Sequence, residues 1–93
     1  MSFDVGQSVL IPCSVQPGAF PDESLVTIEF ASETLSGFVQ NRYLQGQAVR
    51  GTVLDTGPEW ITVRVPGSFF TQATGKTLIP AAWASDHLQT VSA

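Results

Sequence analysis

Apolar and polar residues alternate along several short stretches of the chain. The alternating series run over residues 8–15, 26–30, 49–53 and 61–65. A period of two places successive side chains on opposite faces of a β-strand, so each series predicts a strand with one buried face. Two shorter strands are expected at residues 36–40 and 77–79. The pattern therefore predicts an all-β protein.

Glycine and proline punctuate this pattern. Dipeptides that are typical of tight turns lie between the stretches, at Pro17-Gly18, Gly57-Pro58 and Pro66-Gly67. The one helical candidate covers residues 80–88 and opens with Pro80, a residue suited to the first position of a helix. Because this segment is short, we expect a single helical turn there.

The alternation is compatible with an internal repeat. Segments 5–10, 25–30 and 37–43 resemble segments 49–54, 60–65 and 77–83, in that order. This alignment predicts two related βββ halves, each ending in a tight turn that carries an aromatic residue. It also gives Glu29 and Arg64 equivalent positions with opposite charge. The alternative is that two unrelated meanders share alternating Val, Ile and Thr, as any two meanders do.

Two segments resemble the closing segment of Src-homology-3 domains. In that family a glycine, two apolar residues and a proline lead into a short helical turn that bears a tyrosine. The matching residues are Gly37-Phe38-Val39-Gln40-Asn41-Arg42-Tyr43-Leu44 and Leu78-Ile79-Pro80-Ala81-Ala82-Trp83. The Ala-Leu-Tyr-Asp-Tyr run and the Trp-Trp pair of the family are absent, so the resemblance implies the barrel and not proline-peptide recognition. We expect one domain over residues 1–93, a small SH3-like barrel or a curled antiparallel sheet of five to six strands.

The composition bears on possible partners. Only 13% of the residues are charged, against about 25% in a typical soluble protein. A chain this small exposes much of its surface, so the low charge favours a surface that a partner covers in part, and we expect a homo-oligomer. The alternative is a Thr- and Gln-rich β surface that meets only water.

The charges are also scattered. The net charge is −4, and the basic residues are isolated from one another: Arg42, Arg50, Arg64 and Lys76. Binding to nucleic acid or to a membrane surface needs clustered cations, so we expect neither partner. The chain has no apolar run of about 20 residues, no signal-peptide pattern at its start and a single cysteine, which together favour a cytoplasmic location.

One motif suggests catalysis. Val53-Leu54-Asp55-Thr56-Gly57 resembles the active-site signature of aspartic proteases, in which two aspartates share a proton. A chain with one such motif could supply the pair only as a homodimer, with Asp55 as the catalytic residue. Pro58 departs from the Ala or Ser that the family has after the glycine. The favoured interpretation is a hairpin turn, for which Asp, Gly and Pro are the expected residues.

The remaining candidates for chemistry are single residues. His87 is the only histidine, so no cluster with metal-ligand spacing can form, and we expect no metal or cofactor. Cys13 lies in phase with Val9 and Ile11, which predicts a buried apolar role and not a nucleophile. Trp60 is expected in the core or at the rim of the barrel.

Aromatic residues in loops are the strongest indication of function. Phe20 follows one Pro-Gly turn, and Phe69 and Phe70 follow another. Loop aromatics on a rigid barrel commonly build a binding surface, to which Tyr43 and Trp83 in the helical turns would add. The alternative is that the loop phenylalanines fold back to close the ends of the barrel. The sequence thus favours a non-catalytic, self-associating interaction module that binds a protein or a small ligand. A homodimeric hydrolase using Asp55, or a small oligomeric enzyme with its site on a symmetry axis, is the alternative.

Overall fold

The computed structural model describes residues 3–30, 33–66, 68–69 and 76–91. Their strands are β1 (Ser8–Pro12), β2 (Ser14–Pro17), β3 (Glu23–Phe30), β4 (Glu33–Gln40), β5 (Ala48–Thr56), β6 (Trp60–Arg64), β7 (Ser68–Phe69), β8 (Lys76–Pro80) and β9 (Gln89–Thr90). A 3₁₀ turn, η1 (Asn41–Tyr43), follows β4, and a helix, α1 (Ala81–His87), follows β8. Among the described residues, no helix is long and apolar enough to cross a membrane.

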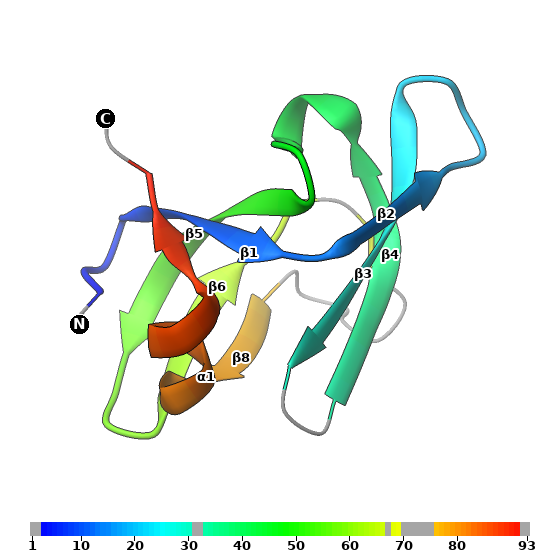
Figure 1. Ribbon diagram of the computed structural model, residues 1–93. Coiled ribbons are helices and arrows are strands. Elements are labelled where there is room, and N and C mark those ends of the chain that lie inside the picture. Colours follow the sequence, from blue (N-terminus) through cyan, green and yellow to red (C-terminus); the bar gives the residue numbers. More distant parts are fainter. Residues whose placement is uncertain (1–2, 31–32, 67, 70–75, 92–93) are drawn as a thin grey trace.

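The strands form two antiparallel sheets (Figure 1). One has the order β8-β6-β5-β1-β9 and the other β2-β3-β4-β7. The chain passes from the first sheet to the second at Cys13, between β1 and β2. The all-β, antiparallel class is confirmed. Of the two forms expected, a closed barrel or a curled sheet, the described strands have the open one, because no ladder joins the two sheets into a ring.

Three local expectations differ from the structure. The segment after Pro80 forms a helix of seven residues and not a single turn. Cys13 is only partly buried, because the predicted strand breaks there and the Cys13 amide donates a hydrogen bond of 2.9 Å to the Gln47 carbonyl. Trp60 is 51% exposed and does not belong to the core.

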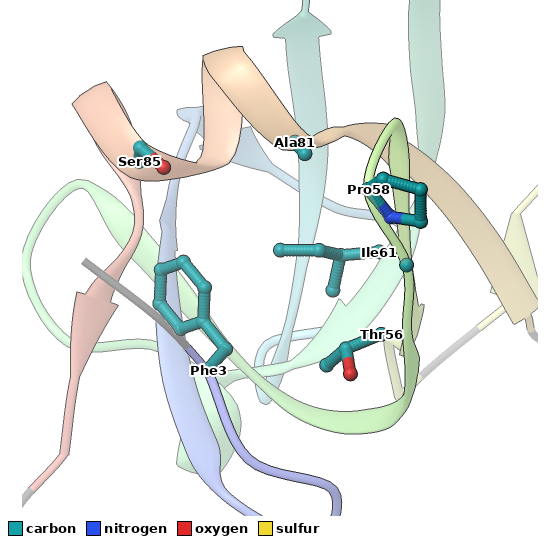
Figure 2. Close-up of a pocket in the computed structure, with 7 residues that line it drawn as sticks. Phe3, Thr56, Pro58, Ile61, Ala81 and Ser85 are labelled. Atoms are coloured by element: carbon teal, nitrogen blue, oxygen red, sulfur yellow. The ribbon is translucent and has the colours of Figure 1, made fainter.

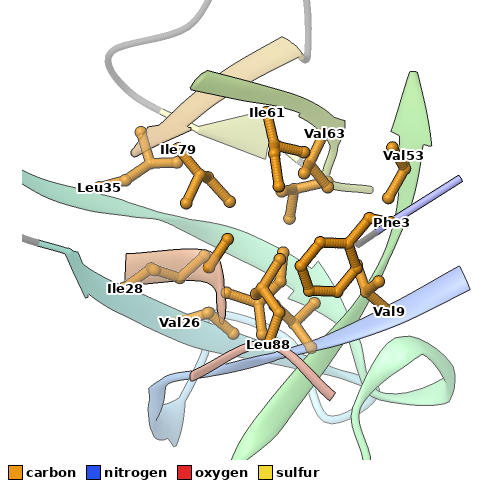
Figure 3. Close-up of a cluster of buried hydrophobic side chains, with 14 of the residues drawn as sticks. Phe3, Val9, Val26, Ile28, Leu35, Val53, Ile61, Val63, Ile79 and Leu88 are labelled. Atoms are coloured by element: carbon orange, nitrogen blue, oxygen red, sulfur yellow. The ribbon is translucent and has the colours of Figure 1, made fainter. Parts of the chain in front are cut away.

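The core lies between the two sheets (Figure 3). Both sheets contribute the apolar phase of their alternation, and the N-terminal segment, α1 and the residue after it add further side chains. The buried apolar residues are Phe3, Val9, Ile11, Val26, Ile28, Leu35, Val39, Val49, Val53, Ile61, Val63, Val65, Ile79, Ala84 and Leu88. Small β-branched side chains predominate, since they suit a pleated, close-packed surface.

The two halves of the chain share one strand arrangement. In each half three strands pair in the order first, second, third, and the third leads into a helical turn: β2, β3, β4 and η1, then β5, β6, β8 and α1. Val15 pairs with Val26 in the first half, as Val53 pairs with Val63 in the second. Four residues before Val15 and Val53 lie Ile11 and Val49, which pair with each other. A pseudo-twofold axis therefore passes between Ile11 and Val49.

Backbone hydrogen bonds at the helical turns follow the same symmetry. The Asn41 amide donates to the Asp22 carbonyl over 2.9 Å, and the Ala81 amide donates to the Glu59 carbonyl over 2.8 Å. Each bond joins the start of a helical turn to the residue just before the middle strand of that half, which is β3 or β6. The two halves thus share one pattern of strand pairing, while their relation by duplication stays a prediction.

The equivalent residues differ in part from those that the sequence alignment gave. Segments 37–43 and 77–83 are equivalent, as expected, because Gly37 and Thr77 pair with Val26 and Val63. The alignment of segment 25–30 with segment 60–65 is wrong by two residues. The alignment of segment 5–10 with segment 49–54 is wrong by six. In consequence Arg64 is equivalent to Thr27 and not to Glu29. Strand register depends on turn length and on the buried face, and the loops of the two halves differ in length.

Candidate functional site

The first candidate site is a groove between β2, the β2–β3 loop and η1. We call it the β2–β3 corner; it is lined by residues 15–21, 23, 24 and 41 and has a volume of about 490 Å³. Phe20 lies on its rim with 64% of its surface exposed. Burying a phenylalanine side chain stabilises a fold by about 2 kcal/mol or more, and a side chain as exposed as Phe20 contributes little of this. The sequence prediction that placed Phe20 at a loop surface is in accord with this position.

Local hydrogen bonds fix the shape of this corner. The Gly18 amide donates to the Glu23 carbonyl, and a side chain at Gly18 would approach that oxygen to 2.7 Å, so only glycine fits. The Ser24 hydroxyl donates a 2.5 Å hydrogen bond to Asn41 Oδ1 at the floor. Asn41 Nδ2 in turn donates to the Pro21 carbonyl over 3.3 Å. These bonds join the loop, β3 and η1, and give the groove a polar floor.

The second candidate site is the symmetry-related groove of the other half. We call it the β5–β6 corner; it is lined by Phe3, residues 56–58, Ile61, Ala81 and Ser85 and has a volume of about 380 Å³. Figure 2 shows Phe3 and Ile61 on the wall of this pocket, with Ala81 and Ser85 on the helix beside them. Phe3 is only 6% exposed. A buried aromatic side chain from the N-terminal segment therefore forms one wall of this corner.

Two sequence differences separate the corners. The β2–β3 loop has five residues, 18–22, whereas the β5–β6 loop has three, 57–59, and Phe20 belongs to the longer loop. The floor residues Ser24 and Asn41 of the first corner correspond to Ile61 and Ala81 in the second. One corner thus has a polar floor and an exposed aromatic, and the other has an apolar floor and a buried aromatic.

Asp55, the candidate protease residue, lies at the end of β5 next to a β-bulge. Its Oδ1 accepts a 2.9 Å hydrogen bond from the Thr56 amide, and the residue is exposed. The Asp-Thr-Gly segment leads into the turn between β5 and β6, as the hairpin interpretation predicts. The carboxylate here has a local role in shaping that turn.

The other predicted binding residues are dispersed. Tyr43 packs against the core, with the Arg42 guanidinium 4.9 Å from its ring centre and a 3.0 Å hydrogen bond from Arg42 to its hydroxyl. Trp83 also packs against the core, on α1. The backbone of Phe69 lies in β7, beside Gly37. The Phe69 side chain and all of Phe70 lie outside the described residues. Of the described side chains, Tyr43 and Trp83 do not line the β2–β3 corner with Phe20.

A smaller pocket brings together titratable side chains whose proximity the sequence did not predict. Its volume is about 230 Å³, and Cys13, Glu29, Trp83 and His87 are among its lining residues. The His87 and Trp83 rings stack with centroids 4.5 Å apart, and His87 Nδ1 lies 2.9 Å from the Trp83 carbonyl oxygen. Burial raises the pKa of the Cys13 thiol from 9.0 to about 11, so the thiol stays protonated at neutral pH and is a poor nucleophile.

A metal role for this pocket is not indicated. Within the part of the chain that the structure describes, no three His, Cys, Asp or Glu side chains are grouped closely enough to hold a metal ion. No signal in the sequence brings Cys13, Glu29 and His87 together, because they come from three elements far apart along the chain.

Comparisons with known proteins add no relative. No protein-family profile, curated protein or solved structure matches this chain.

Proposed function

We propose that the protein is a non-catalytic interaction module that binds a segment of a partner protein at the β2–β3 corner. The observation that carries this proposal is Phe20, an aromatic side chain held 64% exposed on the rim of a groove by a glycine-dependent loop. Exposed aromatics beside a preformed concave site are typical of binding hot spots.

The partner segment is expected to carry an aromatic side chain. In the symmetry-related β5–β6 corner, the chain's own Phe3 forms one wall of the groove and is 6% exposed. The backbone of the β2–β3 corner follows the same arrangement, yet among the described residues only the corner's own elements line it. An aromatic side chain from another protein can take the place that Phe3 has in the second half.

Charge adds a second requirement. Asp22 precedes β3 and is exposed, and Glu23 lines the groove. Two adjacent carboxylates favour a Lys or Arg next to the partner's aromatic residue, and they disfavour an acidic segment. Since the chain as a whole has a net charge of −4, a basic partner is also attracted from a distance.

The wider expectations from the sequence belong to this proposal. They are an SH3-like type of fold, a cytoplasmic location, and no binding to nucleic acid or membranes. The helical turns that bear Tyr43 and Trp83 support the first of these, because each follows its strand at the place where the resemblance was found.

The test is an NMR titration with short peptides. The probe is Lys-Phe-Lys flanked by glycines, and the matched peptides have Lys-Ala-Lys or Glu-Phe-Glu at the centre. We expect the first peptide alone to shift the amide signals of Val15, Ser24 and Asn41, with a dissociation constant of about 1 mM or tighter. Shifts that are equal for all three peptides, or that are absent from these residues, would contradict the proposal.

Two variants complete the experiment. Phe20→Ser removes the rim aromatic and is expected to weaken the Lys-Phe-Lys peptide at least about fivefold. Val5→Ser is the matched control, because Val5 is equally exposed, at 65%, and does not line the groove. An effect of both variants, or of neither, counts against the β2–β3 corner.

A further inference from the structure

The outer face of β6 and β8 carries two exposed apolar side chains next to each other. Trp60 is 51% exposed and Leu78 is 57% exposed. Leu78 pairs with Thr62, and Thr62 lies two residues after Trp60, so the period of two puts all three side chains on one face. Both residues line a shallow groove of about 320 Å³. We call this surface the Trp60–Leu78 face.

Charges of opposite sign lie at the two ends of this face. Glu59 is exposed and lies beside Trp60 at one end. Arg64 is exposed at the other end of β6, two residues past Thr62 on the same side of the sheet. Trp60 and Arg64 are about 13 Å apart along the strand. The face therefore has an acidic end, an apolar centre and a basic end.

We propose that a second copy of this chain packs on the Trp60–Leu78 face, with the two copies related by a twofold axis at Thr62 and Leu78. This axis lies in the plane between the two packed faces and runs perpendicular to the strands. The strands of one copy therefore run antiparallel to those of the other. It places Arg64 of each copy against Trp60 and Glu59 of the other, and Leu78 against Leu78. The face is thereby complementary to itself, as an isologous contact requires.

The contacts that β6 and β8 make are favourable. The guanidinium of Arg64 stacks on the indole of Trp60 and meets the carboxylate of Glu59. The two leucines exclude water at the centre. Asp55 pairs with Thr62 from the neighbouring strand β5 and lines the same groove, so the axis brings the Asp55 carboxylates of the two copies near each other, a like-charge contact that weakens the dimer. The low charge of the chain, which favoured self-association from the sequence, is consistent with this surface.

The dimer is expected to be weak. Stable interfaces bury about 800 Å² of each partner, and two short strands offer less than that. We expect the mass measured by light scattering to rise from monomer toward dimer between about 10 µM and 1 mM protein. Trp60→Ser and Leu78→Thr are each expected to raise the dissociation constant by about tenfold or more. Phe20→Ser, which removes an equally exposed aromatic elsewhere, should leave it unchanged.

A charge exchange tests the geometry. Arg64→Glu alone and Glu59→Arg alone each create two like-charge contacts in the homodimer, so each variant should remain monomeric. Mixed in equal amounts, the two variants should form a heterodimer, because every contact then joins opposite charges. Both substitutions are on the surface, and circular dichroism of each variant checks that the fold is kept.

Three results would overturn the proposal: a wild-type monomer at 1 mM, a dimer that Trp60→Ser leaves intact, or a mixture of the two charge variants that stays monomeric. The proposal does not depend on the β2–β3 corner, which is a separate surface. Failure of the peptide titration would leave the dimer standing, and the reverse also holds.

Discussion

The two corners of this protein have the same backbone plan and opposite surfaces. In the β5–β6 corner, Phe3 is buried over an apolar floor, and in the β2–β3 corner, Phe20 is exposed over a polar one. The difference arises from a loop longer by two residues and from the exchange of Ile61 and Ala81 for Ser24 and Asn41. A repeated architecture can thus use one corner for stability and leave the other for a partner.

The largest expected effect on stability comes from the β5–β6 corner. Phe3→Ala removes a buried aromatic ring and leaves a cavity against Ile61, so we expect a loss of about 3 kcal/mol in the free energy of unfolding. Urea denaturation followed by circular dichroism measures it. Phe20→Ala is the matched variant in the open corner and is expected to change stability by less than about 0.5 kcal/mol. Equal losses in the two variants would mean that the corners do not differ in the way described.

The next effect concerns the centre of the long strands. Gly51 in β5 is equivalent to Cys13, and a Cβ atom at Gly51 would lie 2.9 Å from Val63 Cγ1 and 3.2 Å from Ile11 Cδ1. Gly51→Ala therefore overpacks the core, and we expect a loss of about 1–3 kcal/mol. Cys13→Ala, at the equivalent position where the strand bends, is expected to cost less than about 1 kcal/mol. The same denaturation experiment compares them, and a neutral Gly51→Ala would show that the strands shift without cost.

A smaller effect is expected at the polar floor. Ser24→Ala removes the donor to Asn41 Oδ1 at a position that is 8% exposed, and the loss should be about 1 kcal/mol. A double-mutant cycle with Asn41→Ala isolates the pair, and the coupling should equal most of that loss. The corresponding pair in the other corner, Ile61 and Ala81, has no such bond to lose. A coupling near zero would mean that the floor of the open corner is held by other contacts.

The sequence predicted the strands well because burial follows alternation. Val26, Ile28, Val53 and Val63 are all in the apolar phase and are all fully buried. Trp60 lies in the polar phase of its strand, with Thr62 and Arg64, so its exposed position was available from the same pattern. The prediction that Trp60 lies in the core or at the rim of the barrel gave residue type more weight than phase.

Other features depend on contacts that alternation does not encode. The symmetry between the halves was predicted with two of its three registers shifted, because turn lengths and the buried face set register. Phe3 precedes the first strand and belongs to no alternating series, so nothing in the sequence marked it as the wall of a corner. Phe20 could be predicted as a surface aromatic because it follows a Pro-Gly turn, but its groove depends on η1, which begins at Asn41, 21 residues further along the chain.

The last prediction concerns Cys13, which lies between β1 and β2 and is equivalent to Gly51, and it is a change of stability at alkaline pH. Burial raises the pKa of the Cys13 thiol to about 11 in the folded protein, above the value of 9.0 for an unburied thiol. The unfolded chain then loses its proton first, so the stability contributed by the neutral thiol is complete below pH 9 and falls as the pH rises toward 11. Urea denaturation at several pH values should show this decline in the wild type and not in Cys13→Ala. Alkylation of the folded protein should also be slower at pH 8 than that of the unfolded chain, and equal rates would mean that Cys13 is as open as an unfolded residue.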